Sequence, residues 1–231
     1  MIASFVTAII SAIFSASLIA RLRRRGGAHH AAWAVALALF SLAVLAQGLF
    51  LAGWREAWLY RLWYFSGALT SAAYLGVGSL YLAGGSRWGH PALWAVTVAA
   101  LYALGRVLVA PVELERLSAQ TLSGAAMPAA VRLLSPFFHA FGTAAVVGTA
   151  LHSAFAWMRR RTDPAWAYRA LGSTLVALGV AVIAAVDTLL RLGVADLFAL
   201  GQLVGIATVF AGYRLATRPS GAARARWPES A

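Results

Sequence analysis

The 231-residue sequence predicts an all-α integral membrane protein, built as a polytopic bundle of about seven transmembrane helices. Hydrophobic residues make up 61% of the chain and charged residues only 11%, whereas soluble domains carry roughly 25% charge. The apolar residues fall in runs near the ~20 residues that a helix needs to cross the hydrocarbon of a bilayer. These runs leave no room for a separate soluble domain, so we expect one transmembrane domain over 1–215 and a short basic tail over 216–231.

Seven apolar runs mark the expected helices. They are Ile2–Ala20, Ala31–Gly53, Leu62–Ala83, Ala92–Ala110, Phe137–Trp157, Leu171–Leu190 and Leu197–Tyr213. The first run has the length of a secretory signal, but its positive charges follow the run rather than precede it. We therefore expect it to stay in the mature protein as the first crossing.

The arginines predict an orientation with the N-terminus outside and the C-terminus in the cytoplasm. Cytoplasmic loops of membrane proteins carry an excess of positive charge. This orientation puts thirteen of the 19 cationic residues inside, and the opposite one would put six there. The inner set is Arg21, Arg23, Arg24, Arg25, Arg87, Arg159, Arg160, Arg161, Arg169, Arg214, Arg218, Arg224 and Arg226, and the outer set is Arg55, Arg61, Arg106, Arg116, Arg132 and Arg191. The expected location is the cell membrane, with several crossings.

The outer loop 111–136 is the longest connection, and loops of this length without structure are uncommon. It carries the apolar residues Val112, Leu114, Leu117 and Leu122 among charged ones, which predicts a short amphipathic helix on the outer surface. Such a helix would cover helix ends or form a lid over an outward cavity. None of the seven prolines falls inside an expected helix, so we expect no proline kinks and a fairly rigid bundle.

Composition excludes several classes of protein. The chain has no Lys, and a rhodopsin-type retinal protein needs one for its Schiff base. It has no Cys, which excludes disulfides, thiolate metal sites and cysteine nucleophiles. Sequence signatures of metalloproteases, serine hydrolases and nucleotide-binding loops are missing, so we expect no enzyme activity and no cofactor. The net charge of +12 is explained by the inner loops, so we expect no nucleic-acid partner.

Polar residues at membrane depth are costly and are the default candidates for function. Five of them are expected in the outer half of the bilayer: Gln47, Arg106, His139, Asp187 and Gln202. Together they predict an outward-facing ligand site in which Arg106 binds an anionic group and Asp187 is its counter-ion. A purely structural alternative is a salt bridge of Asp187, either to Arg106 or to Arg191 at i+4.

The histidines and small residues favour helix packing over a cofactor site. His139 and His152 share a helix but lie about 140° apart around it, so they cannot both ligate one haem. His152 with His90, His29 or His30 remains an alternative for one metal or haem. We interpret three sets of small residues as close helix contacts: Ala140, Ala144 and Gly148 next to His152; Ala68, Ala72 and Gly76; and Gly201 with Gly205.

A shift of 136 residues relates two parts of the chain. It maps Ser17, Ala20 and Arg23–Arg25 onto Ser153, Ala156 and Arg159–Arg161. Helices one to three and five to seven would then be parallel copies joined by the fourth, a plan known in transporters. This layout resembles, in topology only, the sugar-transporting SWEET and vitamin-transporting PnuC proteins, although the Pro-Gln dipeptide of the SWEET-related families is missing. The chain also resembles bacterial seven-helix inner-membrane proteins, which implies no particular activity.

Two functions remain open at this point. The first is a membrane protein that binds a small anionic or polar solute, as a transporter or a sensor. The second is a structural or accessory subunit that packs through its small-residue stripes against a membrane protein partner or a second copy of itself. The clustering of polar residues in the outer half favours the first.

Overall fold

The computed structural model describes residues 2–117, 122–159, 164–191 and 197–216, without the side chains of 164–166, 190 and 191. All regular secondary structure in these residues is helical, which confirms the all-α prediction. Six helices are long and apolar enough to cross a membrane: Ile2–Arg25, Ala28–Leu51, Ala57–Val109, Ala129–Arg159, Ala167–Leu189 and Phe198–Ala216. The basic tail, from residue 217 on, lies outside the described residues.

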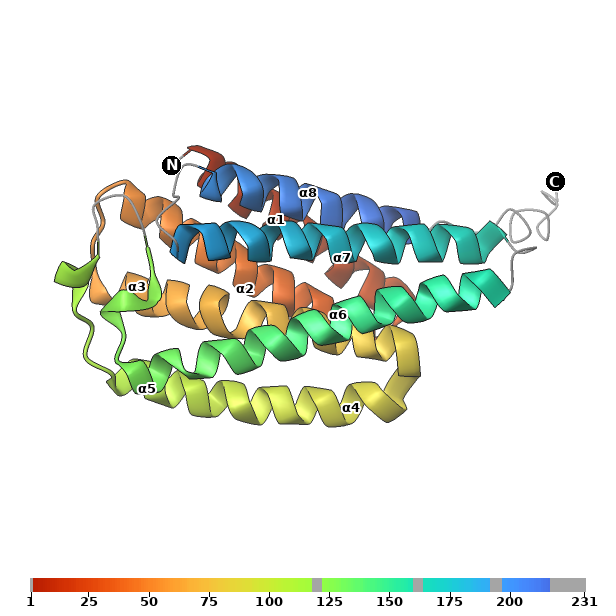
Figure 1. Ribbon diagram of the computed structural model, residues 1–231, viewed down its shortest axis with the longest axis horizontal. Coiled ribbons are helices and arrows are strands. Elements are labelled where there is room, and N and C mark those ends of the chain that lie inside the picture. Colours follow the sequence, from red (N-terminus) through yellow and green to blue (C-terminus); the bar gives the residue numbers. More distant parts are fainter. Residues whose placement is uncertain (1, 118–121, 160–163, 192–196, 217–231) are drawn as a thin grey trace.

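The elements follow one another in the order α1 (Ile2–Arg25), α2 (Ala28–Leu51), α3 (Ala57–Trp63), the π-helix η1 (Tyr64–Ser71), α4 (Ala72–Val109), the 3₁₀ turns η2 (Leu114–Arg116) and η3 (Gly124–Ala126), α5 (Ala129–Arg132), α6 (Leu134–Arg159), α7 (Pro164–Arg191) and α8 (Phe198–Ala216). They form one elongated bundle, in which α1 begins at one end and α8 finishes at the other (Figure 1). The loops therefore lie at the two ends of the bundle.

The 53-residue helical segment Ala57–Val109 contains two of the expected helices, and it doubles back at Gly85. Gly85 has φ 60° and ψ −150°, a backbone conformation that is essentially restricted to glycine. The hydroxyls of Tyr74 and Thr97, 23 residues apart, are hydrogen-bonded at 3.2 Å across the two arms. The segment is thus a helical hairpin whose arms run antiparallel on either side of Gly85.

Arg61 joins the two arms of this hairpin at the other end. Its guanidinium donates to the carbonyl oxygens of Val107 at 3.2 Å and Ala110 at 2.9 Å. Carbonyls in the last turn of a helix have no partner within the helix, and a cation there also matches the helix dipole. Arg61 therefore caps the end of α4 and holds α3 beside it.

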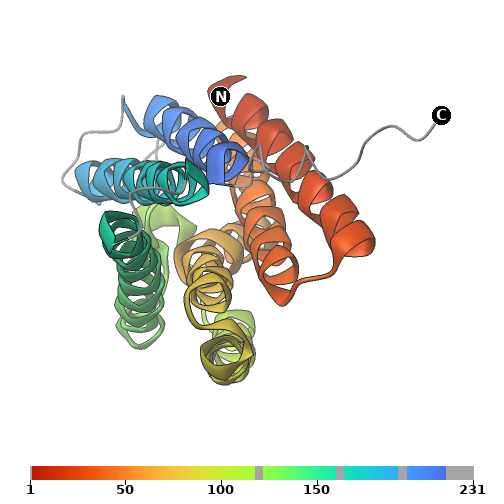
Figure 2. The same cartoon turned by 90° about the vertical axis from the view of Figure 1, so that its right-hand side faces the viewer.

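Helix α2 lies near the middle of the bundle. It packs against α1, α4 and η1, while α8 packs against α1 and α7, and α6 lies between α4 and α7 (Figure 2). A Cβ on Gly142 of α6 would overlap the carbonyl oxygen of Ala72, and one on Gly76 would lie 2.9 Å from the Cα of Gly142. The contact between α4 and α6 therefore depends on residues without side chains.

Two of the expected close contacts between helices through small residues form, and one does not. Ala72 and Gly76 contact α6 as expected, and a Cβ on Gly205 of α8 would lie 2.9 Å from the carbonyl oxygen of Gly179 on α7. The packing face expected on α6 is wrong, because Ala140, Ala144, Gly148 and His152 are all exposed. The buried face of α6 lies on the other side of the helix, at Phe138, Gly142, Ala145, Val146 and Thr149.

The prolines also correct an expectation. Pro91 lies inside α4, because the second arm of the hairpin begins directly after Gly85 rather than at Ala92. Pro136 is the third residue of α6 and Pro164 the first residue of α7, and the first turn is where helices tolerate proline. The helices are therefore longer than expected and include Pro91, Pro136 and Pro164.

In residues 111–117 and 122–136, the outer loop does not form an amphipathic helix lying on the surface. In its described residues it forms η2, η3 and α5, and it buries Leu117, Leu122, Met127 and Val131 against the end of the bundle. The Tyr60 hydroxyl of α3 donates to the carbonyl oxygen of Ser123 in the loop at 2.7 Å. The loop thus covers the helix ends, which is the first of the two roles considered for it.

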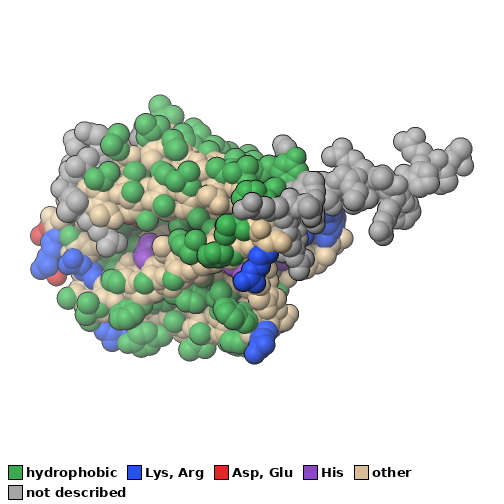
Figure 3. Space-filling model, turned by 45° about the vertical axis from the view of Figure 1, so that its right-hand side comes forward, with side chains coloured by type: hydrophobic (Ala, Val, Ile, Leu, Met, Phe, Trp, Pro, Cys, Tyr) green, Lys and Arg blue, Asp and Glu red, His purple; other side chains and the backbone are tan. Residues whose placement is uncertain are grey.

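The surface is mainly apolar along the length of the helices. On the face in Figure 3, hydrophobic side chains cover the middle of the bundle and arginines gather toward its two ends. Many large apolar side chains on the helices are exposed, for example Ile13 at 61%, Leu101 at 64% and Phe155 at 60%. A polypeptide with such a surface is suited to a lipid environment rather than water.

Candidate functional site

Two of the predicted site residues meet in the interior of the bundle. Gln47 on α2 and Gln202 on α8 are 2% and 5% exposed, and the Gln47 Nε2 donates to the Gln202 Oε1 at 3.4 Å. The same Nε2 also lies 3.4 Å from the Oγ of Ser4 on α1, which is fully buried. Three helices that are distant in the sequence therefore each place one polar side chain at the same point.

The cluster of Ser4, Gln47 and Gln202 contains an unsatisfied acceptor. The Oε1 of Gln47 is buried and has no hydrogen-bond partner in the described residues. Leaving a buried polar atom unpaired costs about 1–3 kcal/mol, and most such atoms in native proteins have a partner. The Oε1 of Gln47 can therefore accept a hydrogen bond from, or coordinate, a small bound group or a water.

A row of hydroxyls extends from this cluster into the bundle along α1. Ser4, Thr7, Ser11 and Ser15 are at most 5% exposed and lie on one face, three or four residues apart. Sequence reasoning missed this row, although its spacing is visible in the sequence and marks a buried polar face of a helix. The polar interior is thus larger than the five residues that the sequence suggested.

Asp187 lies on the same side of the α7–α8 pair as Gln202. A Cβ on Gly201 of α8 would overlap Val186 of α7, so these two residues face each other across the pair. Asp187 follows Val186 and Gln202 follows Gly201, and each residue is turned by about 100° around its helix from the one before it. Because α7 and α8 are antiparallel, these turns bring Asp187 and Gln202 to the same side of the pair. Asp187 is half-buried there and is the only acidic residue in the six membrane-length helices.

His139 has a defined structural partner in η1. Its Nε2 is 3.0 Å from the carbonyl oxygen of Ala68, and the Ser135 hydroxyl donates to the same oxygen at 2.8 Å. A π-helix shifts the backbone pairing from i+4 to i+5, and such segments are frequent at functional sites. The π-helix could not be predicted, because nothing in the residues Tyr64–Ser71 separates it from an ordinary helix.

Arg106 does not join the other predicted site residues. It is exposed on the second arm of the hairpin, beside the exposed Tyr102 and Gly105. Helix α6 lies between α4 and α7, so it separates the helix that carries Arg106 from the helix that carries Asp187 (Figure 2). The structure therefore brings together Gln47 and Gln202, places Asp187 and His139 at the same end of the bundle, and leaves Arg106 outside.

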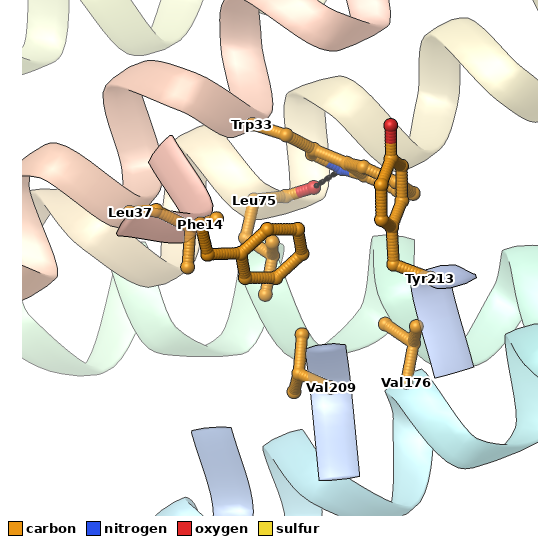
Figure 4. Close-up of a pocket in the computed structure, with 7 residues that line it drawn as sticks. All are labelled: Phe14, Trp33, Leu37, Leu75, Val176, Val209 and Tyr213. Carbon is orange, nitrogen blue, oxygen red and sulfur yellow. Dashed lines mark hydrogen bonds between the residues drawn. The ribbon is translucent and has the colours of Figure 1, made fainter. Parts of the chain in front are cut away.

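A pocket at the other end of the bundle is apolar. It is lined by Phe14, Trp33, Leu37, Leu75, Val176, Val209 and Tyr213 (Figure 4). The Trp33 Nε1 donates to the carbonyl oxygen of Leu75 at 3.1 Å, so the indole is held across the pocket. Its cavity volume is only about 10 Å³, which is room for about one water. In this conformation it is a packing gap and not a solute site.

No group of three His, Asp or Glu side chains within the described residues is arranged as a metal site would be. Comparison of the chain with protein-family models, with curated proteins and with solved structures finds no match. The candidate site is therefore defined by its own geometry, as a buried polar cluster of Ser4, Gln47 and Gln202 with Asp187 and His139 at the same end.

Proposed function

We propose that this chain is a seven-crossing membrane protein that binds a small polar solute from the outer side, as a transporter or a sensor. The N-terminus lies outside and the C-terminus in the cytoplasm. The single observation that carries the solute-binding proposal is the buried Gln47 Oε1 without a partner, in a cluster formed by three different helices.

The crossing number and the orientation rest on the hairpin and on the arginines. The two arms of Ala57–Val109, counted separately, make seven crossings from the six membrane-length helices. An odd number of crossings agrees with Figure 1, in which α1 begins at one end of the bundle and α8 finishes at the other. The last turns of α1, α6 and α8 carry arginines: Arg23, Arg24, Arg25, Arg159 and Arg214. Positive charge at the ends of these outward-to-inward helices favours a cytoplasmic location for them.

The location of the polar cluster supports a site that opens outward. Ser4, Gln47, Gln202, Asp187 and His139 each lie within five residues of the helix end on the outer side, a depth of about 8 Å at ~1.5 Å per residue. A solute entering from outside would meet this cluster first. The site consists of these residues and does not include Arg106.

Single cysteines test this proposal directly, because the chain has none of its own. Ser4→Cys is nearly isosteric and replaces a fully buried hydroxyl in the cluster. In intact cells, a membrane-impermeant thiol reagent should label Ser4→Cys, and it should leave Ser79→Cys, which is 2% exposed in another part of the interior, unlabelled. Glu115→Cys in the exposed outer loop is the positive control, and Arg24→Cys, at the opposite end, should be labelled only after the cells are opened.

Each outcome of the labelling experiment has a defined meaning. Labelling at residues 4 and 115, and not at 79, supports a water-accessible outer site. Labelling at 115 alone means a bundle that is closed to the reagent and contradicts a solute site that opens outward. Labelling at 24 from outside contradicts the orientation.

The accessory-subunit function is supported by a different observation. Trp94, Val98, Leu101 and Tyr102 form an exposed stripe on the second arm of the hairpin, and a Cβ on Gly105 beside it would meet no atom within 4 Å. A stripe with an open glycine and an arginine suits a second transmembrane helix. Cross-linking through Gly105→Cys in membranes, lost in Arg106→Met, would favour this function.

A further inference from the structure

The hydroxyls beside the Ser4–Gln47–Gln202 cluster present oxygen lone pairs rather than protons. The Thr7 hydroxyl donates to the carbonyl oxygen of Ala3 at 2.8 Å, and the Ser11 hydroxyl to that of Thr7 at 2.7 Å. A hydroxyl has one proton and two acceptor lone pairs. Once the proton is used within α1, only the acceptors remain for a guest.

The amide of Gln47 has the same character. Its Nε2 faces the two acceptors Ser4 Oγ and Gln202 Oε1, while its Oε1 has no partner. Turning the amide around would place its oxygen 3.4 Å from the oxygen of Gln202, where two acceptors face each other. With Gln202 oriented as it is, this orientation of Gln47 avoids that contact, and the unpaired atom is then an acceptor.

The nearest negative charge in the helices also lies on this side. Asp187 is the only acidic residue in the six membrane-length helices, and it projects to the same side of the α7–α8 pair as Gln202. A carboxylate on the same side of this helix pair as Gln202 favours a positively charged guest over an anion. Arg106, which would have favoured an anion, lies outside the site.

We propose that the cluster binds a small monovalent cation, either a metal ion or an ammonium group, with Gln47 Oε1 as a direct ligand. This inference rests on the proposed solute site and specifies the chemical class of its ligand, which the sequence had suggested to be anionic or polar. Ser4 Oγ and Gln202 Oε1 are the neighbouring oxygens. The guest must be small, because all three side chains are at most 5% exposed and closely placed.

Thermal unfolding of the full-length protein in detergent tests this proposal. The probes are the chlorides of sodium, potassium, ammonium and methylammonium, each compared with choline chloride at equal ionic strength. A ligand at 100 times its Kd should raise the Tm by about 5–10 °C, and above the Kd the rise should grow with the logarithm of the ligand concentration. The two metal salts distinguish an inorganic ion from an amine as the natural guest.

Variants locate the effect. Gln47→Leu should abolish the cation-dependent rise in Tm. Ser4→Ala is a smaller change, for use if Gln47→Leu does not fold. It should weaken the apparent affinity for the cation about tenfold, which corresponds to about 1.4 kcal/mol. Thr208→Val is the matched control on α8, because its exposed hydroxyl bonds only to its own helix at Val204, and it should keep the full rise.

Failure of this inference is distinguishable from failure of the proposed function. If Ser4→Cys is labelled from outside but no small cation differs from choline, the site is real and the cation proposal is overturned in favour of a neutral guest or water. If Ser4→Cys is not labelled and no cation acts, both are overturned. A rise in Tm that survives both Gln47→Leu and Ser4→Ala places the cation elsewhere and also overturns the proposal.

Discussion

Replacing Gly142 with alanine should loosen the contact between α4 and α6, because the new Cβ would overlap the carbonyl oxygen of Ala72. The clash is with backbone, which cannot rotate away as the end of a side chain can. Overpacking of this kind costs typically 1–3 kcal/mol. Helix propensity offsets little of that cost, because a transmembrane helix remains helical when it separates from its neighbours.

Gly148→Ala is the matched control for this substitution. Gly148 lies on the same helix, and a Cβ there would meet no atom within 4 Å. Its effect should stay within about 0.5 kcal/mol, as for other substitutions away from packed sites. At about 2–4 °C per kcal/mol, Gly142→Ala should lower the Tm by roughly 2–12 °C, and Gly148→Ala by no more than about 2 °C.

Thermal unfolding in one detergent, followed by the fluorescence of the nine tryptophans, measures both variants under the same conditions. Gly76→Ala extends the test, since its Cβ would lie 2.9 Å from the Cα of Gly142. Both changes open the same gap, so the double variant should lose less than the sum of the two single losses. Equal Tm values for Gly142→Ala and Gly148→Ala would refute the packing argument, and with it the assignment of the buried face of α6.

Three further predictions concern the hairpin and η1. Arg61→Met should cost about 1.5–3 kcal/mol, because two carbonyls of the α4 end lose a charged donor, whereas the exposed Arg106→Met should leave the Tm unchanged; equal losses would contradict the cap. Gly85→Ala should cost about 1–3 kcal/mol, seen as a lower Tm, and a neutral effect would mean that the turn does not need its φ of 60°. Ser135→Ala should lower the stability by about 0.6–1.7 kcal/mol. The double variant with His139→Leu should have a still lower Tm, because the Ala68 carbonyl then has no side-chain donor. An unchanged Tm in the double variant would mean that η1 does not depend on these bonds.

The fold class was predictable because the membrane imposes length and apolarity on every crossing. The predicted runs match the helices to within a few residues, except where a helix continues through polar residues such as Arg87 and His90. Those residues lie beside the turn at Gly85. Hydropathy recognises the apolar core of a helix and not its ends.

The candidate site was predictable only in part. Gln47 and Gln202 were found because amides are rare in apolar runs, and their burial follows from that cost. The side of a helix on which a given residue lies was not predictable, because a helix that is apolar on all sides has no polar face to mark which side is buried. The exposure of Arg106 was therefore not foreseen, and the packing face of α6 was assigned to Gly148 rather than Gly142.

The π-helix η1 determines the rotational register of the first arm of the hairpin. A turn with i+5 pairing takes in one residue more than an α-turn, so the residues before Tyr64 are rotated relative to those after Ser71. Before it, Tyr60 reaches the outer loop at Ser123; after it, Ala72 meets Gly142 on α6. Deleting a single residue between them would turn one end by about 100° relative to the other, and the arm could then satisfy its loop or its neighbouring helix, but not both.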